Sequence, residues 1–220
     1  MTISELQIQL DISSGNEIEV LKQHARKIDN GYLFVDSSNG QCYLLDWHGK
    51  LDDISKVKRI GKYAFADCKS FNNIIIPDSV ENIGDKAFYY CKSLKSIIIP
   101  DSVKSIGDYA FYNCTSLESI TIPGSVKSIR KGAFYCCKSL KSITISDSVK
   151  SIGDSAFYYC KSLESITIPD LVENIGEWIF SGCTSLKEVI FKRKTIDKVK
   201  TMDNYPWCIK DISIIKCQMS

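Results

Sequence analysis

Cysteines that recur at a fixed spacing are the residues of this chain with the clearest chemical potential. Six of the ten cysteines follow one another at a constant 23-residue interval: Cys68, Cys91, Cys114, Cys137, Cys160 and Cys183. Such a column could form disulfides or hold a metal ion. Side chains stacked in register point in parallel, however, so their Cβ atoms stay about 5 Å apart, wider than the ~3.8 Å of a disulfide. A linear column also does not converge tetrahedrally, as zinc ligands must. We expect buried free thiols, with no metal and no cofactor.

A second column consists of carboxylates and could indicate calcium. Asp78, Asp101, Asp147 and Asp170 share this column, and Gly124 interrupts it. Calcium takes about 6–8 oxygen ligands, which is more than the column offers. Aspartates in a turn context commonly accept hydrogen bonds from nearby backbone amides. We therefore expect these residues to stabilise turns.

Catalytic constellations are not evident in the repeated part of the chain. His24 and His48 are the only histidines, and both precede the repeats. No Ser-His-Asp or Cys-His arrangement can be built from the repeats, and no glycine-rich phosphate loop is present. We expect no catalytic residues and no enzyme. An enzyme housed in the N-terminal region remains an alternative.

Composition and charge exclude two further classes of function. The 28 basic and 26 acidic residues give a net charge of +2, which argues against a nucleic-acid binder with a basic stripe. No apolar run approaches the length of a membrane-spanning helix, so we expect no membrane insertion. The N-terminus lacks the basic and apolar regions of a secretory signal. That pattern predicts an intracellular protein or a chain that lacks its leader, and the location is left open.

The elements that position these columns follow from the same period. Short segments such as Leu94–Pro100 are predicted to be strands, in which successive side chains point alternately inward and outward, with Ile97 and Ile99 facing inward. A core phenylalanine recurs at the same 23-residue interval in six copies: Phe65, Phe88, Phe111, Phe134, Phe157 and Phe180. A fixed period of about 20–29 residues with Leu-x-x-Ile-x-Ile is typical of a leucine-rich-repeat solenoid. We therefore expect a row of stacked 23-residue coils.

The corner and the turn of each coil also have expected conformations. Glycine follows an isoleucine of the repeat at four positions, where a tight corner would favour φ > 0: Gly84, Gly107, Gly153 and Gly176. Arg130 takes this place in one copy, so the corner does not strictly demand glycine. The Ala-Phe pair that follows is predicted to lie on a single helical turn.

Both ends of the chain lie outside the repeat and are expected to cover the apolar ends of the stack. At the N-terminus we expect a strand over 6–12, helical spacing over 16–28, and a hairpin of strands 31–35 and 41–47. At the C-terminus, 195–202 could form a short helix. We divide the chain into an N-terminal cap (1–50), a solenoid (51–191) and a C-terminal cap (192–220).

The repeat Leu-x-x-Ile-x-Ile-Pro-x-x-Val-x-x-Ile-Gly-x-x-Ala-Phe-x-x-Cys resembles the BspA-like class of leucine-rich repeats, over roughly 51–191. This resemblance implies an α/β solenoid: a right-handed stack with a parallel sheet on its concave side and short helical turns on its convex side. It also implies a binding role, since bacterial members are surface or secreted adhesins for host proteins. A cell-surface or secreted location is possible on the same grounds.

Two surfaces are candidates for binding a protein partner of unknown identity. The first is the outward face of the concave sheet, where short side chains would let a partner approach closely: Ser96, Ile98, Ser119, Thr121, Ser142, Thr144, Ser165 and Thr167. Thr and Ile also simply suit strands. The second is a tyrosine face: Tyr89, Tyr112, Tyr135 and Tyr158. These rings could equally rest on the coils. We favour a non-catalytic protein-interaction module that uses the concave sheet; the rival is an architectural protein that self-associates through the tyrosine face or the solenoid ends.

Overall fold

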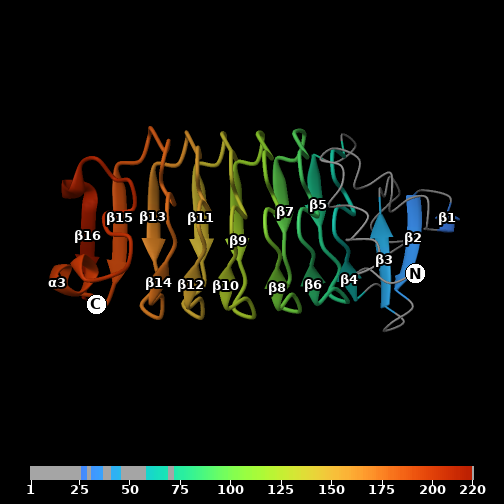
Figure 1. Cartoon of the computed structure of the whole chain (residues 1–220), viewed down its shortest axis with the longest axis horizontal. Coiled ribbons are helices and arrows are strands. Elements are labelled where there is room, and N and C mark those ends of the chain that lie inside the picture. Colours follow the sequence, from blue (N-terminus) through green and yellow to red (C-terminus); the bar gives the residue numbers. More distant parts are fainter. Residues whose placement is uncertain (1–25, 29–30, 37–40, 46–57, 69–71, 220) are drawn as a thin grey trace.

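The computed structural model describes residues 26–28, 31–36, 41–45, 58–68 and 72–219. Its coils lie in a row along the long axis, with the N-terminal strands at one end and the C-terminal helix at the other (Figure 1). Each coil contributes one longer and one two-residue strand, and neighbouring coils pair in parallel, each strand with its counterpart one repeat further along the chain. The predicted solenoid is confirmed, as a parallel β-solenoid with little helix.

The longer strands form what we call the long-strand sheet. Its strands are β5 (Asn73–Ile75), β7 (Ser96–Ile98), β9 (Ser119–Ile122), β11 (Ser142–Ile145), β13 (Ser165–Ile168), β15 (Glu188–Lys192) and β16 (Ile215–Gln218). Strands β5 to β11 form one hydrogen-bonded group and β13, β15 and β16 another, and β11 contacts β13. Residues face alternately inward and outward along each strand, because side chains of a β-strand have a period of two.

A second ladder of two-residue strands was not predicted. It comprises β4 (Arg59–Ile60), β6 (Asn82–Ile83), β8 (Ser105–Ile106), β10 (Ser128–Ile129), β12 (Ser151–Ile152) and β14 (Asn174–Ile175). We call it the short-strand ladder. Each of its isoleucines is buried. The ladder therefore holds the coils together on a second side through backbone hydrogen bonds.

The predicted helical turn around each core phenylalanine is wrong. The turn of one coil contains two residues with left-handed φ, such as Lys86 (φ 53°) and Tyr90 (φ 61°). Their amides donate to carbonyls of the next coil, at 2.8 Å to Asp108 and 2.8 Å to Tyr112. An α-helix directs its amides to its own carbonyls four residues earlier, so it could not make these bonds between coils.

Glycine is favoured at this corner, but for another reason than predicted. None of Gly84, Gly107, Gly153 and Gly176 has a positive φ. A Cβ on Gly107 would instead lie 2.4 Å from the backbone nitrogen of Asp85. At these four glycines, successive coils approach too closely to leave room for a side chain.

Arg130 stands at this corner in one coil, and the short-strand ladder is interrupted there. Strands β4, β6 and β8 form one group, and β10, β12 and β14 form another. The break lies between β8 and β10, and Arg130 directly follows β10. Gly107 and Gly153 each donate to the preceding coil at 2.8 Å, whereas no such backbone bond from Arg130 occurs among the described residues. The arginine side chain instead pairs with Asp108, at 2.9 Å from Nε to Oδ1.

The core consists of the predicted columns, continuous through the coils. The six phenylalanine rings stack nearly in parallel, with centroids 5.0–6.1 Å apart. The inward isoleucines, the valines, the alanines and the cysteines join them in one buried cluster. Each coil therefore packs its apolar residues against one another and against those of its two neighbours.

The N-terminal hairpin is confirmed for the residues that the structure describes. Strand β2 (Gly31–Asp36) pairs antiparallel with β1 (Arg26–Ile28) and with β3 (Gln41–Leu45). Ile28 was expected within a helical segment, but it lies in β1 because it pairs with Gly31. The expected strand over 6–12 and most of the expected helical segment lie outside the described residues. Strand β3 contacts β4, the first strand of the short-strand ladder.

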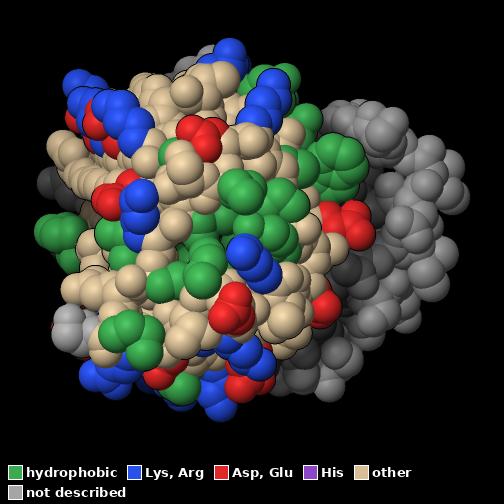
Figure 2. Space-filling view, turned by 90° about the vertical axis from the view of Figure 1, so that its left-hand side faces the viewer, with side chains coloured by type: hydrophobic (Ala, Val, Ile, Leu, Met, Phe, Trp, Pro, Cys, Tyr) green, Lys and Arg blue, Asp and Glu red, His purple; other side chains and the backbone are tan. Residues whose placement is uncertain are grey.

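The C-terminal segment continues the long-strand sheet. Helix α3 (Ile196–Lys200) begins after Thr195, whose side chain accepts a hydrogen bond from the Lys198 amide. A 3₁₀ turn, η2 (Ile212–Ile214), then leads into β16, which pairs in parallel with β15. Figure 2 shows this end of the molecule, with apolar side chains gathered near the middle of the face and charged ones around them.

Candidate functional site

The outward face of the long-strand sheet is built from residues in strict register. Ser142 pairs with Ser119, and Thr144 pairs with Thr121. The sequence placed the same residues together, so their arrangement follows the prediction. At the N-terminal half of the face, Ile75 and Ile98 are 65% and 59% exposed, on the adjacent strands β5 and β7. The face therefore combines a small apolar area with rows of outward-facing hydroxyl side chains.

Charged residues line the border of this face, and the sign of their charge alternates from one coil to the next. Lys141 pairs with Glu118 of the preceding coil at 3.4 Å, and Lys187 pairs with Glu164 at 3.2 Å. All four side chains are more than half exposed. Pairs of this kind contribute about 0–1 kcal/mol each to stability. These ion pairs therefore hold the charged side chains in place along the border of the sheet face, and they contribute little to the stability of the fold.

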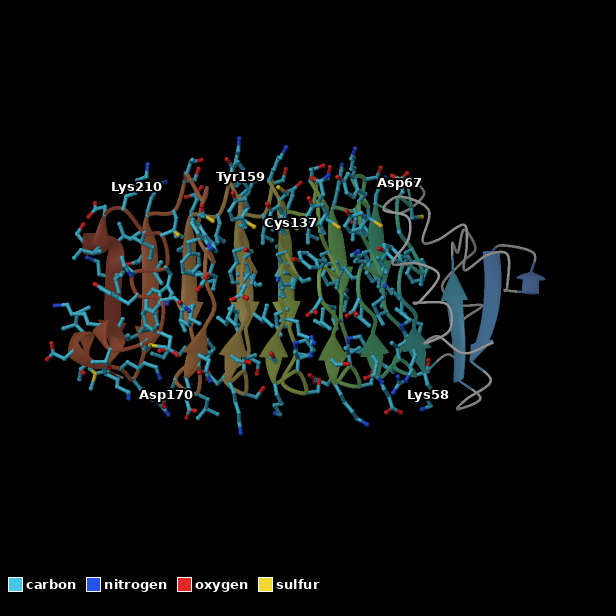
Figure 3. All side chains as sticks on the ribbon, viewed as in Figure 1. Lys58, Asp67, Cys137, Tyr159, Asp170 and Lys210 are labelled. Carbon is cyan, nitrogen blue, oxygen red and sulfur yellow. The ribbon has the colours of Figure 1, made fainter. Side chains whose placement is uncertain are left out.

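The tyrosine column forms a continuous ladder on the turn edge of the solenoid. The rings of Tyr89, Tyr112, Tyr135 and Tyr158 stack with centroids 4.6–4.9 Å apart. Figure 3 shows this edge at the top, with Tyr159 labelled beside the ladder. Burial and neighbouring phenols raise the pKa of Tyr112 to about 12. The rings therefore contribute to packing between coils, which is the structural role that the sequence left open.

The cysteine column is buried and hydrogen-bonded. Each thiol donates to the carbonyl of a phenylalanine in the preceding coil, with Sγ–O distances of 2.9–3.1 Å, in Cys91, Cys114, Cys137, Cys160 and Cys183. Burial raises the pKa of Cys91 and of Cys183 to about 12. A thiolate is the nucleophile and the metal ligand, so the raised pKa disfavours the reactive form of these thiols in the folded protein.

We expect thiol labelling to divide the cysteines by burial. At about pH 8 the folded protein will react at the exposed Cys208 and will protect Cys91, Cys114, Cys137 and Cys160, because the buried thiols remain protonated and inaccessible. After denaturation without reductant, nearly all ten cysteines will react. Mass spectrometry of the labelled peptides measures both results. Three or more disulfides among the six repeat cysteines would contradict the stacking geometry.

The carboxylates in the described part of the chain do not form a metal site. No group of three or more His, Cys, Asp or Glu is placed to hold a metal ion there. Asp147 and Asp170 instead pair with Lys192 and Lys194. A groove of ≈480 Å³ follows the short-strand ladder past Arg130, but its arginine is already paired with Asp108. What the described residues offer are surfaces for binding.

Lysines beside the tyrosine ladder were missed by the sequence reasoning. The Nζ atoms of Lys92 and Lys161 lie 5.2 and 5.6 Å from the ring centroids of Tyr90 and Tyr159. The signal was present as the tripeptide Tyr-Cys-Lys in two copies. The tripeptide alone does not show that the tyrosine and the lysine are in contact, because the turn conformation is what brings the two side chains to one edge.

Comparison with known families agrees with this architecture. The model of the BspA type leucine rich repeat region matches residues 50–162 and 104–216, in six copies. The chain belongs to the BspA-type leucine-rich-repeat family. No curated protein matches the chain. No helix in the described part of this BspA-type protein has the length and apolar character needed to cross a bilayer.

Three solved structures similar to this BspA-type chain are of bacterial proteins. A leucine rich cell surface protein from Faecalibacterium prausnitzii is 28% identical, with a TM-score of 0.54 over 76% of this chain and 54% of its own. A leucine-rich repeat protein from Bacteroides ovatus is also 28% identical, with a TM-score of 0.60 over 80% of this chain and 51% of its own. A leucine rich repeat protein of T. pallidum, at 23% identity, has a TM-score of 0.61 over 89% and 82%, which shows the fold alone. The chain spans about half the length of the first and second of these proteins.

Proposed function

We propose that this BspA-type protein is a non-catalytic interaction module that binds a protein partner through the outward face of the long-strand sheet. The observation that carries the proposal is the exposure of Ile75 and Ile98 on a face whose neighbouring strands present serines and threonines outward. Large apolar side chains exposed together commonly mark interaction surfaces. Short neighbours let the backbone of a partner approach closely.

The position of this face within the stack supports the same proposal. Register pairing from β5 to β11 presents its side chains as one surface spanning several coils. In repeat proteins such extended surfaces are the usual binding sites. The alternating ion pairs at its border occupy Glu118 and Glu164, so the partner is expected to rely on apolar contacts and hydrogen bonds to hydroxyls rather than on charge.

A role in surface recognition is part of the proposal. The F. prausnitzii relative is described as a cell surface protein, and its similarity to this chain supports a location where the chain meets external partners. The identity of the partner is not implied by the fold. An adhesin-like activity is the form of recognition that we favour.

The rival architectural role makes a different prediction in solution. We expect the purified chain to sediment as a single monomeric species over a wide range of concentration, and to retain one protein in stoichiometric amount from a pull-down analysed by mass spectrometry. A size that grows with concentration, with no protein retained, would instead support self-association through the tyrosine ladder or the solenoid ends.

A further inference from the structure

The turn edge of the solenoid combines the tyrosine ladder with a column of lysines. The ladder consists of Tyr89, Tyr112, Tyr135 and Tyr158. Lys92, Lys138 and Lys161 occupy equivalent positions, three residues after Tyr89, Tyr135 and Tyr158. We call these seven residues the tyrosine–lysine edge. It lies opposite the edge that carries Lys58 and Asp170 (Figure 3), and it is separate from the sheet face proposed above.

The tyrosines offer hydroxyls to a ligand, because their ring faces are covered. Adjacent rings in the ladder lie at 17–20° to each other with centroids 4.6–4.9 Å apart, so each ring face contacts the next ring. The ring edges and the hydroxyls face outward, and the hydroxyls of Tyr135 and Tyr158 also hydrogen-bond to each other. Burial raises the pKa of both Tyr112 and Tyr135, so these hydroxyls stay neutral and can donate as well as accept hydrogen bonds.

The lysines supply positive charge along this edge, which also carries an acidic residue of the first coil, Asp67 (Figure 3). Lys92, Lys138 and Lys161 are exposed and form no ion pair with any residue in the described ranges. Lys138 and Lys161 both lie near the Cys136 thiol, where their charge opposes the rise that burial causes in its pKa. The segments 89–93, 112–116, 135–139 and 158–162 contain no aspartate or glutamate. Cations and neutral hydroxyls thus recur together along the stack.

We propose that the tyrosine–lysine edge binds an extended anionic polysaccharide, with sulfate or carboxylate groups on the lysines and sugar hydroxyls on the tyrosine hydroxyls. A ligand with a short repeat suits a surface that repeats with every coil, and the spacing of the tyrosines is comparable with the length of one sugar unit. Exposed lysines bind through screened charge, while the hydroxyls add hydrogen bonds that an anion alone does not use.

Two other classes of polymer fit this edge less well. Single-stranded nucleic acids bind chiefly by stacking bases on exposed aromatic faces, and the ladder covers its own faces. An extended acidic peptide would need free backbone groups to add to a sheet. The turn amides of this edge already donate to the next coil, as Tyr90 does to Tyr112 at 2.8 Å and Cys136 does to Tyr158 at 2.7 Å.

The test measures binding of the full chain to heparin, as a sulfated polysaccharide, and to dextran, poly-glutamate and single-stranded DNA. We expect binding to heparin that weakens as salt is raised, much weaker binding to poly-glutamate and DNA, and none to dextran. The triple variant Lys92→Gln, Lys138→Gln, Lys161→Gln should lose about tenfold in heparin affinity or more, because three exposed ion pairs are removed. No binding to heparin would overturn the proposal, as would equal binding to poly-glutamate or DNA.

Matched variants separate the edge from net charge and from stability. Lys104→Gln, Lys127→Gln, Lys150→Gln removes the same charge from the stacked column that includes Lys58, on the opposite edge, and should leave heparin affinity within about twofold of the wild type. Tyr112→Phe with Tyr135→Phe keeps the ring stack and removes two hydroxyls, so it should weaken heparin binding at an unchanged melting temperature. Equal losses in the two lysine triples, or full affinity in the Tyr→Phe variant, would contradict the assigned site.

Discussion

Deletion of residues 192–220 is expected to make the chain aggregate. The segment supplies β16, which pairs with β15, and Trp207, whose ring lies 5.3 Å from that of Phe191. Without it the last coil would expose its apolar cross-section and an unpaired parallel strand, which is a template for association. Size-exclusion chromatography and thermal unfolding measure the effect. A truncated chain that stays monomeric with an unchanged melting temperature would show that this segment is not a cap.

A pair of tryptophan variants gives the same test at the level of one side chain. Trp207 is 1% exposed and its Nε1 donates to the Asp203 carbonyl at 2.7 Å, whereas Trp178 is 56% exposed. Trp207→Ala should lower the free energy of unfolding by about 3–5 kcal/mol. Trp178→Ala removes an equal volume from the surface and should change it by about 0.5 kcal/mol or less. Chemical denaturation of the two variants compares the values directly, and similar values would contradict a packing role for Trp207.

The inside of the solenoid could be predicted because each core column has a period in the sequence. Phe111, Ile120 and Val126 recur with one spacing, and the structure buries each of them. In a one-dimensional stack a residue packs on its own counterpart in the next coil. The contacts of the core can therefore be predicted from the sequence, and the strand register follows from the same 23-residue interval.

The outside of the coil was less predictable, because its conformation depends on where backbone amides find partners. The turn at Lys86 and Tyr90 was expected to be helical, but its amides bond to the next coil. Gly107 was assigned to a positive φ, yet what excludes a side chain is the backbone of Asp85. Neither reason can be seen in a single coil, since both arise only when two coils are placed together.

The candidate binding face illustrates a further limit. The sequence placed Thr121 and Thr144 side by side, and the structure agrees. The residue types that pair well in a parallel sheet are also those that present a flat surface to a partner, so pattern alone does not separate the two roles. The exposure of Ile75 and Ile98 is the information that the structure adds.

Thr144→Arg is expected to produce the largest loss of partner binding without loss of fold. Thr144 is exposed in the middle of the sheet face and touches no core column, so stability should change by about 0.5 kcal/mol or less. A partner packed on the sheet would have to desolvate the new guanidinium with no carboxylate opposite it. An unpaired charge buried in an interface costs about 2–5 kcal/mol, which corresponds to a loss of affinity of about thirtyfold or more.

The measurement that tests the central claim most directly is the affinity of the isolated partner for the wild type, Thr144→Arg and Tyr135→Ser, each first shown to be folded by its melting curve. Tyr135 belongs to the tyrosine ladder of the turn edge rather than to the sheet face, so Tyr135→Ser should bind nearly as the wild type does, while Thr144→Arg loses binding by about thirtyfold or more. Loss of binding in Tyr135→Ser together with full affinity in Thr144→Arg would contradict a binding role for the sheet and assign the partner to the tyrosine ladder.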